Sequence, residues 1–309
     1  MTTPSDPAGP RLLDGGLSTA LEQRGHDLSS RLWTARLLLE QPAEVAAVHE
    51  AYYRAGADVA TTASYQASVP GLVAAGVGER EAREVVRSAV RVAVEVRDRL
   101  AAELGRPLLV AASVGPYGAH LGDGSEYRGR YGVGAAALRD FHGPRLELLA
   151  AEQPDLVAVE TVPDAEEAEV LVPLLAELGL PAWFGYSVAG GATRAGQPLE
   201  EAYAVLAGCP ALVAAGANCS APREVGEALA VAARVTGLPG VGYPNRGETW
   251  DAEAKQWRGD GGFDVATVAS WAAGEDAAAF VGGCCQVGPA DIADLRVALS
   301  AERGRPLAG

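Results

Sequence analysis

The sequence predicts a single-domain α/β protein with the (β/α)8 architecture of a TIM barrel. Eight short apolar segments alternate with longer stretches whose apolar residues recur at helical spacing, which is the element order of this fold. The 309 residues, of which 49% are hydrophobic, are enough to form a large core. Polar and thiol side chains also recur where the apolar segments end, as they do on the catalytic face of a barrel.

Each apolar segment ends near a Gly, Ser, Thr or Asn, which is typical of a strand followed by a turn. Stretches between them, such as residues 42–54 and 78–105, carry the helical spacing and predict amphipathic helices. An open doubly wound sheet is the alternative, and the lack of a GxGxxG turn after the first strand disfavours it. The strands expected in chain order are residues 11–16, 57–65, 107–118, 155–163, 181–188, 211–220, 239–247 and 278–285.

The first ten residues, MTTPSDPAGP, are polar and rich in Pro. They lack the basic and apolar regions of a signal peptide, so we expect a disordered lead-in over residues 1–10 and one barrel domain over residues 11–309. No apolar run approaches the roughly 18–20 residues that cross a bilayer. We therefore expect a cytoplasmic protein, in which disulfides are rare and clustered cysteines indicate metal binding or catalysis.

The formal net charge of −15 limits the classes of partner. An acidic surface repels phosphate backbones and anionic lipids, so the sequence predicts neither a nucleic-acid partner nor a membrane partner. Small molecules are the expected partners, and the sequence leaves open whether identical chains form a homo-oligomer.

Polar side chains stand at the C-terminal ends of most of the expected strands. In a barrel these ends and the loops that follow them form one face, so the side chains are expected to meet there. Strands also end simply because polar turn residues begin, which is the alternative for any one of them. The residues are Asp14, Thr61, Thr62, Ser64, Glu160, Thr161, Ser187, Asn218, Cys219, Asn245, Cys284 and Cys285.

Three of the four cysteines are expected on that face. Cys219 ends the sixth segment in GANC, and Cys284 and Cys285 end the eighth in GGCC. Three thiolates with one exchangeable ligand make a tetrahedral Zn²⁺ site of the catalytic kind, since a structural site closes with a fourth protein ligand. Cys209 precedes the sixth strand, so we place it at the opposite end of the barrel as a buried bystander.

Neighbouring side chains of a strand point to opposite faces, so Cys284 and Cys285 reach one ion only if the chain turns directly after the strand. Gly282 and Gly283 give the backbone that freedom. Two small buried side chains and a redox pair are the alternative interpretations of the adjacent cysteines.

The motifs GANC, YPNRGETWD and GGCC followed by PADI resemble those of the homocysteine S-methyltransferase family. LDGGLSTALEQRG, DVATTASYQAS, SVGPYGAHLGDGSEYRG and ETVPDAEEA extend the resemblance from about Leu12 to Ile292. The resemblance implies a (β/α)8 zinc enzyme that transfers a methyl group to the thiol of L-homocysteine and forms methionine. SYQAS and DGSEYRG are similar to the branch that uses S-methylmethionine or S-adenosylmethionine as the donor.

This chemistry suits the residues present. An alkyl thiol has a pKa near ~8.5 and is mostly protonated at neutral pH, and zinc ligation displaces its proton. A sulfonium donor leaves as a neutral thioether and needs no general acid. This agrees with the lack of paired catalytic carboxylates and with four histidines (His26, His49, His120 and His142) in helical or loop contexts.

Substrate contacts are expected from the remaining polar strand ends. Asp14 and Glu160 can each pair with the substrate ammonium, although a turn residue and a helix cap are the alternatives. Ser64, Thr161 and Asn218 are expected substrate contacts. Asn218, like Asn245, can also support the zinc site or its loops. Aromatic faces attract a sulfonium cation, which makes Tyr65, Tyr117 and Tyr127 candidates for the donor side.

Three other functions remain open from the sequence. The acceptor can be another thiol or a selenol such as selenocysteine. The chain can be a zinc-binding barrel without catalysis, although zinc storage needs no ammonium site. A thiol redox enzyme that uses Cys284 and Cys285 is the third, and it predicts activity without zinc.

Overall fold

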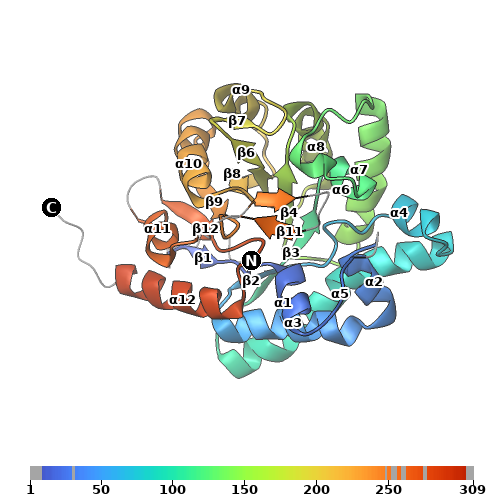
Figure 1. Cartoon of the computed structure of the whole chain (residues 1–309), viewed down its shortest axis with the longest axis horizontal. Helices are drawn as coiled ribbons and strands as arrows, with labels where there is room; N and C mark the ends of the chain where they lie inside the picture. The colour runs from blue at the N-terminus through green and yellow to red at the C-terminus, as the bar shows by residue number, and fades with distance from the viewer. Residues whose placement is uncertain are drawn as a thin grey trace.

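Eight parallel strands form a closed barrel that is surrounded by helices, which confirms the predicted (β/α)8 fold (Figure 1). The computed structural model describes residues 9–29, 32–247, 249–251, 256–258, 262–273 and 277–303, so most of the expected lead-in lies outside the described residues. The hydrogen-bonded strand order is β1-β12-β9-β8-β5-β4-β3-β2, and a parallel bridge between Leu13 and Val59 closes the ring. The strands are β1 (Arg11–Leu12), β2 (Val59–Thr61), β3 (Leu109–Val114), β4 (Leu156–Val162), β5 (Ala182–Tyr186), β8 (Leu212–Asn218), β9 (Gly240–Tyr243) and β12 (Ala278–Val281).

All eight strands lie inside the expected segments and are shorter than them. The expected first strand covers six residues, and β1 keeps two of them because Asp14 and two glycines already belong to the loop above it. The other strands are shorter than expected for the same reason. The polar residues at the ends of the segments lie beyond the strand hydrogen bonds, in the loops at the C-terminal end of the barrel.

The helices pack outside the strands and are amphipathic where they are long. In α5 (Glu79–Leu104) the buried residues recur along one face, from Ala82 to Leu100. No helix in the described ranges is both long and apolar enough to cross a bilayer. The other helices are α1 (Leu17–Gln23), α2 (Thr34–Glu40), α3 (Pro42–Ala55), α4 (Val69–Ala74), α6 (Tyr117–Leu121), η1 (Ser125–Tyr127), α7 (Ala135–Ala150), α8 (Ala165–Leu178), α9 (Leu199–Ala204), α10 (Pro222–Thr236), α11 (Val265–Ser270) and α12 (Pro289–Arg303).

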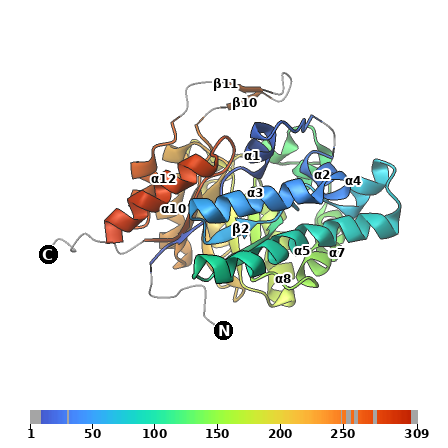
Figure 2. The ribbon, with the colours of Figure 1, turned by 90° about the horizontal axis from the view of Figure 1, so that it is seen from below.

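Two small antiparallel hairpins follow barrel strands on the C-terminal side. β6 (Val188–Ala189) pairs with β7 (Ala192–Thr193) after β5, and β10 (Thr249–Asp251) pairs with β11 (Gln256–Arg258) after β9. Figure 2 shows β10 and β11 projecting from the body of the barrel. Residue 248 of the YPNRGETWD motif lies outside the described residues.

Large side chains fill the inside of the barrel. Trp183 stacks against Phe280 with ring centroids 5.3 Å apart, and its indole nitrogen donates to the Tyr243 hydroxyl at 2.9 Å. Small residues such as Ala158 and Ala214 complete the same buried cluster and leave room for the indole ring. The barrel is therefore a packed core, and a site has room only at its ends.

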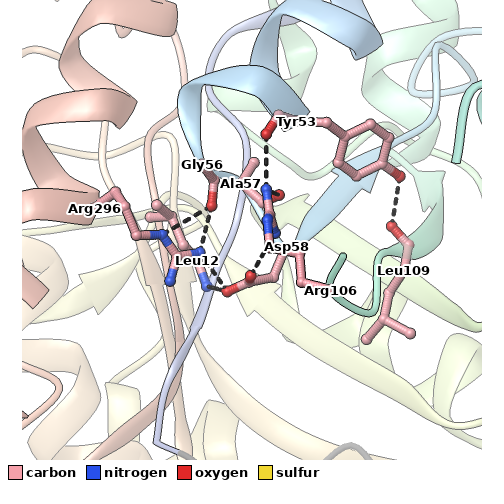
Figure 3. Close-up of polar contacts among 8 residues, drawn as sticks. All are labelled: Leu12, Tyr53, Gly56, Ala57, Asp58, Arg106, Leu109 and Arg296. Carbon is pink, nitrogen blue, oxygen red and sulfur yellow. Dashed lines mark hydrogen bonds and ion pairs between the residues drawn. The ribbon is translucent and has the colours of Figure 1, made fainter. Parts of the chain in front are cut away.

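A buried carboxylate, Asp58, joins β1, β2 and α12 at the N-terminal end of the barrel (Figure 3). Its oxygens accept the backbone N–H of Leu12 at 2.9 Å and form ion pairs with Arg106 at 2.8 Å and Arg296 at 2.6 Å. Arg296 also donates to the Gly56 carbonyl at 2.9 Å. Asp58 is 7% exposed, so its charge depends on these partners.

Arg106 and a tyrosine extend the cluster toward β3. The guanidinium of Arg106 donates to the carbonyls of Tyr53 at 2.7 Å and Ala57 at 2.9 Å, and the Tyr53 hydroxyl donates to the Leu109 carbonyl at 2.8 Å. The contacts connect the end of α3 to the beginning of β3 around the short first strand (Figure 3). They reinforce the place where the barrel closes.

Replacing Asp58 by Asn should therefore destabilise the fold. The variant leaves two arginines without a carboxylate partner, and we expect the free energy of unfolding to fall by about 2–4 kcal/mol. Denaturant unfolding measures this, with Asp98→Asn as the control because the Asp98 side chain is 63% exposed in its ion pair with Arg97. Equal effects of the two substitutions would contradict a closing role for Asp58.

Candidate metal centre

The three cysteines expected on the catalytic face converge above the barrel. Their Sγ atoms all lie within 4.8 Å of one another, and those of Cys219 and Cys285 are 3.6 Å apart. All three are free thiols; Cys219 is buried, while Cys284 and Cys285 are half-buried. Cys209 precedes β8 and contacts the Val172 carbonyl at 3.8 Å, outside this cluster.

A tight turn directs the adjacent cysteines to one point. The N–H of Val287 donates to the Cys284 carbonyl at 3.1 Å, and Gln286 has a φ of 66°, as in a type II turn. Gly283 directly precedes this turn, and a Cβ added to it would be 2.2 Å from a methyl carbon of Val287. The chain thus reverses directly after β12, as the side-chain geometry of adjacent cysteines requires.

Neighbouring loops hold the turn in place. The N–H of Cys284 donates to the Pro244 carbonyl at 2.8 Å, and the N–H of Arg246 donates to the Cys285 carbonyl at 3.1 Å. On the other side, the N–H of Gly283 donates to the Asp14 carbonyl at 3.1 Å. The loops after β1 and β9 therefore position both thiols.

Cys219 comes from a strained backbone beside another strained residue. Its φ is 46° and that of Thr161 is 60°, both in the left-handed region that favours glycine. The Asn218 side chain fixes Thr161, because its Oδ1 accepts the Thr161 N–H at 2.7 Å and its Nδ2 donates to the Thr161 hydroxyl at 2.8 Å. Such strain persists only where the surroundings enforce it, which is common at functional sites.

The three thiols interact electrostatically, so they do not ionise independently. Hydrogen bonds from Cys284, Cys285 and the Tyr127 hydroxyl, which lies 3.2 Å from Cys219 Sγ, lower the pKa of Cys219 well below its usual range. The pKa of Cys284 and that of Cys285 are raised, because each interacts with the Cys219 thiolate and is buried. Only an added cation can keep all three ionised at neutral pH.

The donor set fits a soft tetrahedral ion. Zn–S bonds of about 2.3 Å in a tetrahedron separate two sulfurs by about 3.8 Å. The 3.6 Å between Cys219 and Cys285 is close to this value, and small rotations of Cys284 suffice within the 4.8 Å cluster. Three cysteines can therefore hold a metal ion, and the described residues add no fourth His, Cys or carboxylate ligand to the group.

Asp14 and Glu160 lie buried at the ends of β1 and β4. Asp14 accepts the Thr61 N–H at 2.8 Å and the Thr61 hydroxyl at 2.9 Å, and burial raises its pKa to about 8. Glu160 accepts from the hydroxyls of Ser113 and Tyr243, the latter at 3.1 Å, and burial raises its pKa to about 7. Neither carboxylate forms an ion pair with a described Arg or Lys, so both suit a cationic ligand.

Two of the residues predicted as substrate contacts form hydrogen bonds with strand ends and loops around the site. The Ser64 hydroxyl donates to the Ser113 carbonyl at 2.7 Å and lies 2.6 Å from the Thr62 hydroxyl, fully buried. Asn218 is likewise fully buried, and its side chain is used by Thr161. These geometries suit support of the loops better than contact with a substrate.

The three tyrosines proposed for a cation lie in different places. Tyr127 touches Cys219, and Tyr65 is half-buried beside Trp33, with ring centroids 6.1 Å apart. The charge of Cys219 contributes to the raised pKa of Tyr65, so this ring lies near the thiols. Tyr117 instead packs against Phe141 at 5.0 Å, away from the cluster.

A buried arginine supports the loops that carry Tyr65. Arg145 in α7 donates to the carbonyls of Gly115 at 2.9 Å and of Ser64 and Tyr65 at 2.6 Å each. Burial lowers its pKa to about 10, still far above neutrality. The arginine thus holds the ends of β2 and β3 from the helix side.

The remaining polar residues have structural partners. Asn245 Oδ1 accepts the Gly247 N–H at 2.9 Å, and the Asn245 N–H donates to the Ser220 carbonyl at 3.0 Å, which joins the β8 and β9 loops. None of the four histidines belongs to the thiol cluster. His142, for example, lies 2.8 Å from Glu167 in the core.

Two residues of the site escaped the sequence analysis. Tyr243 links the barrel core to Glu160, but an aromatic residue in an apolar strand is typical of any core. Arg194 lies over the Tyr127 ring at 6.0 Å, and the Gly-rich hairpin around it gave no signal of a site. Both contacts join segments far apart in the chain, so no local pattern predicts them.

Comparison with known proteins agrees with this site. The family model described as homocysteine S-methyltransferase matches residues 11–299. The chain is 43% identical over 291 residues to homocysteine S-methyltransferase of Escherichia coli (strain K12), covering 92% of this chain and 94% of that protein. It is 38% identical over 313 residues to selenocysteine methyltransferase of Astragalus bisulcatus, covering 94% and 92% of the two chains.

A solved structure gives the same result for the fold. The metallated form of the Escherichia coli homocysteine methyltransferase MmuM superposes with a TM-score of 0.82 at 41% identity. The match covers 94% of this chain and 97% of that one. With a family model that spans nearly the whole barrel, the chain belongs to the homocysteine S-methyltransferase family.

Proposed function

We propose that the protein transfers a methyl group from a sulfonium donor to the thiol of L-homocysteine and forms methionine, with zinc held by Cys219, Cys284 and Cys285. The observation that carries the proposal is the cluster of three free thiols within 4.8 Å, at the end of the barrel where two buried carboxylates form no ion pair with an Arg or Lys of the described ranges. The relatives named for homocysteine and the metallated bacterial structure support it.

The three sulfurs favour zinc over a hard cation. Thiolates are soft ligands that suit Zn²⁺, and three of them leave one position of a tetrahedron for a substrate sulfur. When bound, the ion supplies the positive charge that keeps the homocysteine thiol ionised near neutral pH. A reducing, cytoplasmic location belongs to the proposal, since three neighbouring thiols are open to oxidation.

Asp14 and Glu160 bind the ammonium group of homocysteine. Both carboxylates are buried and already accept hydrogen bonds. Burial raises the pKa of Asp14 and the charge of Glu160 adds to this, so an ammonium between them would stabilise both charges. The Asp14 carbonyl accepts the N–H of Gly283, which directly precedes Cys284. The residue that carries this carboxylate therefore contacts the segment that carries the thiols. The amino acid end and the sulfur of homocysteine are thus held from the same two loops. Thr161, held by Asn218 next to Glu160, is a further contact on this side.

The transfer needs orientation more than acid–base catalysis. The homocysteine sulfur attacks the donor methyl carbon in line; one S–CH3 bond forms as the other breaks, and the electron pair stays on the donor sulfur. A sulfonium becomes a neutral thioether, so no group has to protonate the product. The chain contributes by excluding water and aligning the two sulfurs, with the Tyr65 ring available to the donor cation.

Selenocysteine is the second acceptor that a specific observation favours, because the chain is 38% identical to a selenocysteine methyltransferase. Its selenol fits the same thiolate position, and its ammonium lies one carbon closer to the reacting atom. The reach from Asp14 and Glu160 to the metal centre then decides between the two acceptors.

A methyl transfer assay tests the proposal. Zinc-loaded protein receives L-homocysteine or L-selenocysteine with S-methylmethionine, S-adenosylmethionine or betaine, and the methylated product is measured. We expect methionine from a sulfonium donor, a rate at least about 10³-fold lower in Cys285→Ala with its bound zinc lost, and no change in Cys209→Ser. Methylated product formed at an unchanged rate after zinc removal would contradict the role of the metal, and bound zinc without any methylated product would favour a non-catalytic barrel.

The pH dependence of the homocysteine KM tests the role of Glu160. Its pKa near 7 means that protonation removes the charge as the pH falls from 7.5 to 6, so KM should rise by up to about tenfold per pH unit. Glu160→Gln should raise KM at pH 7.5 by about tenfold or more and show a shallower rise. Because thiol protonation affects both proteins equally, identical slopes would exclude Glu160 from ammonium binding.

A further inference from the structure

A second pair of charged side chains borders the thiol cluster on the side of Tyr127. Glu126 precedes Tyr127 in η1, and Arg194 follows β7. The Tyr127 hydroxyl lies 3.2 Å from Cys219 Sγ, and the guanidinium carbon of Arg194 lies 6.0 Å from the centre of the Tyr127 ring. Both charged residues therefore adjoin Tyr127, Glu126 in the chain and Arg194 over its ring.

Glu126 has an unused buried oxygen. Its Oε2 atom is buried and has no hydrogen-bond partner. Burial raises the pKa of the carboxyl to about 7, and the charge of Cys219 adds to the effect. Glu126 in turn raises the pKa of Tyr65, so its carboxylate lies near Tyr65 as well as Cys219. A buried carboxylate oxygen without a hydrogen-bond partner is costly, and it leaves an acceptor for a cationic or donor group of a ligand.

The nearby cation does not neutralise Glu126 through contact. Arg128 is exposed, donates to the Ser125 hydroxyl at 2.8 Å and lies 3.6 Å from Asp123. Its charge lowers the pKa of Glu126 only as a minor contribution after burial. The charge of Glu126 is thus available to a cationic group of a ligand that binds at the site.

Arg194 likewise has polar atoms without a partner among the described residues. Its Nε donates to the Ser187 hydroxyl at 3.3 Å, and it forms no ion pair with a carboxylate of the described chain. Its terminal nitrogens have no protein partner among the described residues, and they are not buried. Its positive charge helps to lower the pKa of Cys219, so it lies close to the reacting centre. A guanidinium with a free fork is suited to a carboxylate.

We propose that Glu126 and Arg194 form a donor subsite that binds the α-ammonium and the α-carboxylate of a sulfonium amino acid. The proposal rests on the methyl transfer proposed above and names the class of donor for it. A methionine-type sulfonium carries both groups on one carbon, and they match one anion and one cation beside Cys219. Asp14 and Glu160 serve the ammonium of the acceptor, so the donor needs charges of its own.

The subsite also explains selection among methyl donors. S-methylmethionine and S-adenosylmethionine both carry the free amino acid, whereas the only ammonium of betaine is the quaternary group that donates the methyl and has no N–H. Glu126 then favours the sulfonium amino acids over betaine, and Arg194 alone does not distinguish them. Both contacts lie on the donor side of the metal centre, so their loss leaves zinc and homocysteine in place.

Donor analogues separate the two contacts. The assay uses zinc-loaded enzyme with S-methylmethionine, with its desamino analogue and with its decarboxylated analogue, at saturating homocysteine. Glu126→Gln should raise the KM for S-methylmethionine at least about tenfold and change that for the desamino analogue less than about twofold. Arg194→Met should show the opposite pattern, with a large effect on the desamino analogue and a small one on the decarboxylated analogue.

Controls connect these effects to donor binding. The homocysteine KM and the zinc content should match the wild type in both variants, and Arg128→Gln should behave as wild type with every donor. Equal losses for all three donors in Glu126→Gln, or a changed homocysteine KM, would overturn the proposal in favour of a structural role.

Direct binding keeps the subsite testable without turnover. Calorimetry of S-methylmethionine with the zinc-loaded protein should give an affinity that Glu126→Gln and Arg194→Met each weaken at least about tenfold. No binding by the wild type, or equal binding by the variants, would overturn the subsite. If the wild type binds S-methylmethionine but methylates neither acceptor, the subsite stands and the proposed methyl transfer fails.

Discussion

The closure of the barrel between β1 and β2 is the contact on which the site depends. β1 has only two residues, and one parallel bridge from Leu13 to Val59 joins it to β2. Below the bridge, Asp58 binds Leu12 and two arginines; above it, Asp14 binds Thr61. The Asp14 carbonyl then accepts the Gly283 N–H of the cysteine turn. The seam that completes the sheet thus also places Asp14, the proposed ammonium contact, in the loop that holds the cysteine turn.

The site collects several groups that are unfavourable in the free protein. Asp14, Glu160 and Glu126 are buried acids with raised pKa values, and the three thiols interact in one cluster. Thr161 and Cys219 have strained backbones. In the proposed function, the metal and the two amino acid substrates supply the positive charges that these acids and thiols lack among the described residues. The rigid barrel holds these groups in position at a cost in stability, as is common at functional sites.

The sequence predicts the fold and the thiol cluster better than the substrate contacts. Strand order follows from alternating local patterns, and in a barrel this order alone brings Cys219 and the adjacent cysteines to one face. The boundaries were too long, because a polar residue that ends a strand looks the same in sequence whether it pairs or turns. Ser64 and Asn218 lie at strand ends as expected, but their side chains are used by neighbouring loops.

Other features depend on contacts that local patterns do not contain. Tyr117 and Tyr127 occupy the same motif, yet only Tyr127 reaches a thiol, because the turn before η1 sends the two rings in different directions. Arg194 and Tyr127 are 67 positions apart in the chain (194 − 127 = 67), and the guanidinium lies over the ring only in the folded barrel. The sequence shows the type of each of these residues, but it does not show where in the fold their side chains lie.

X-ray absorption at the zinc edge tests the central claim most directly, namely that barrel closure brings three sulfurs to one metal and leaves a position for the substrate. The zinc-loaded protein should show three sulfur neighbours at about 2.3 Å and one lighter neighbour, and L-homocysteine should raise the number of sulfurs to four. Four sulfurs before homocysteine is added, or no change after saturation with it, would contradict the account.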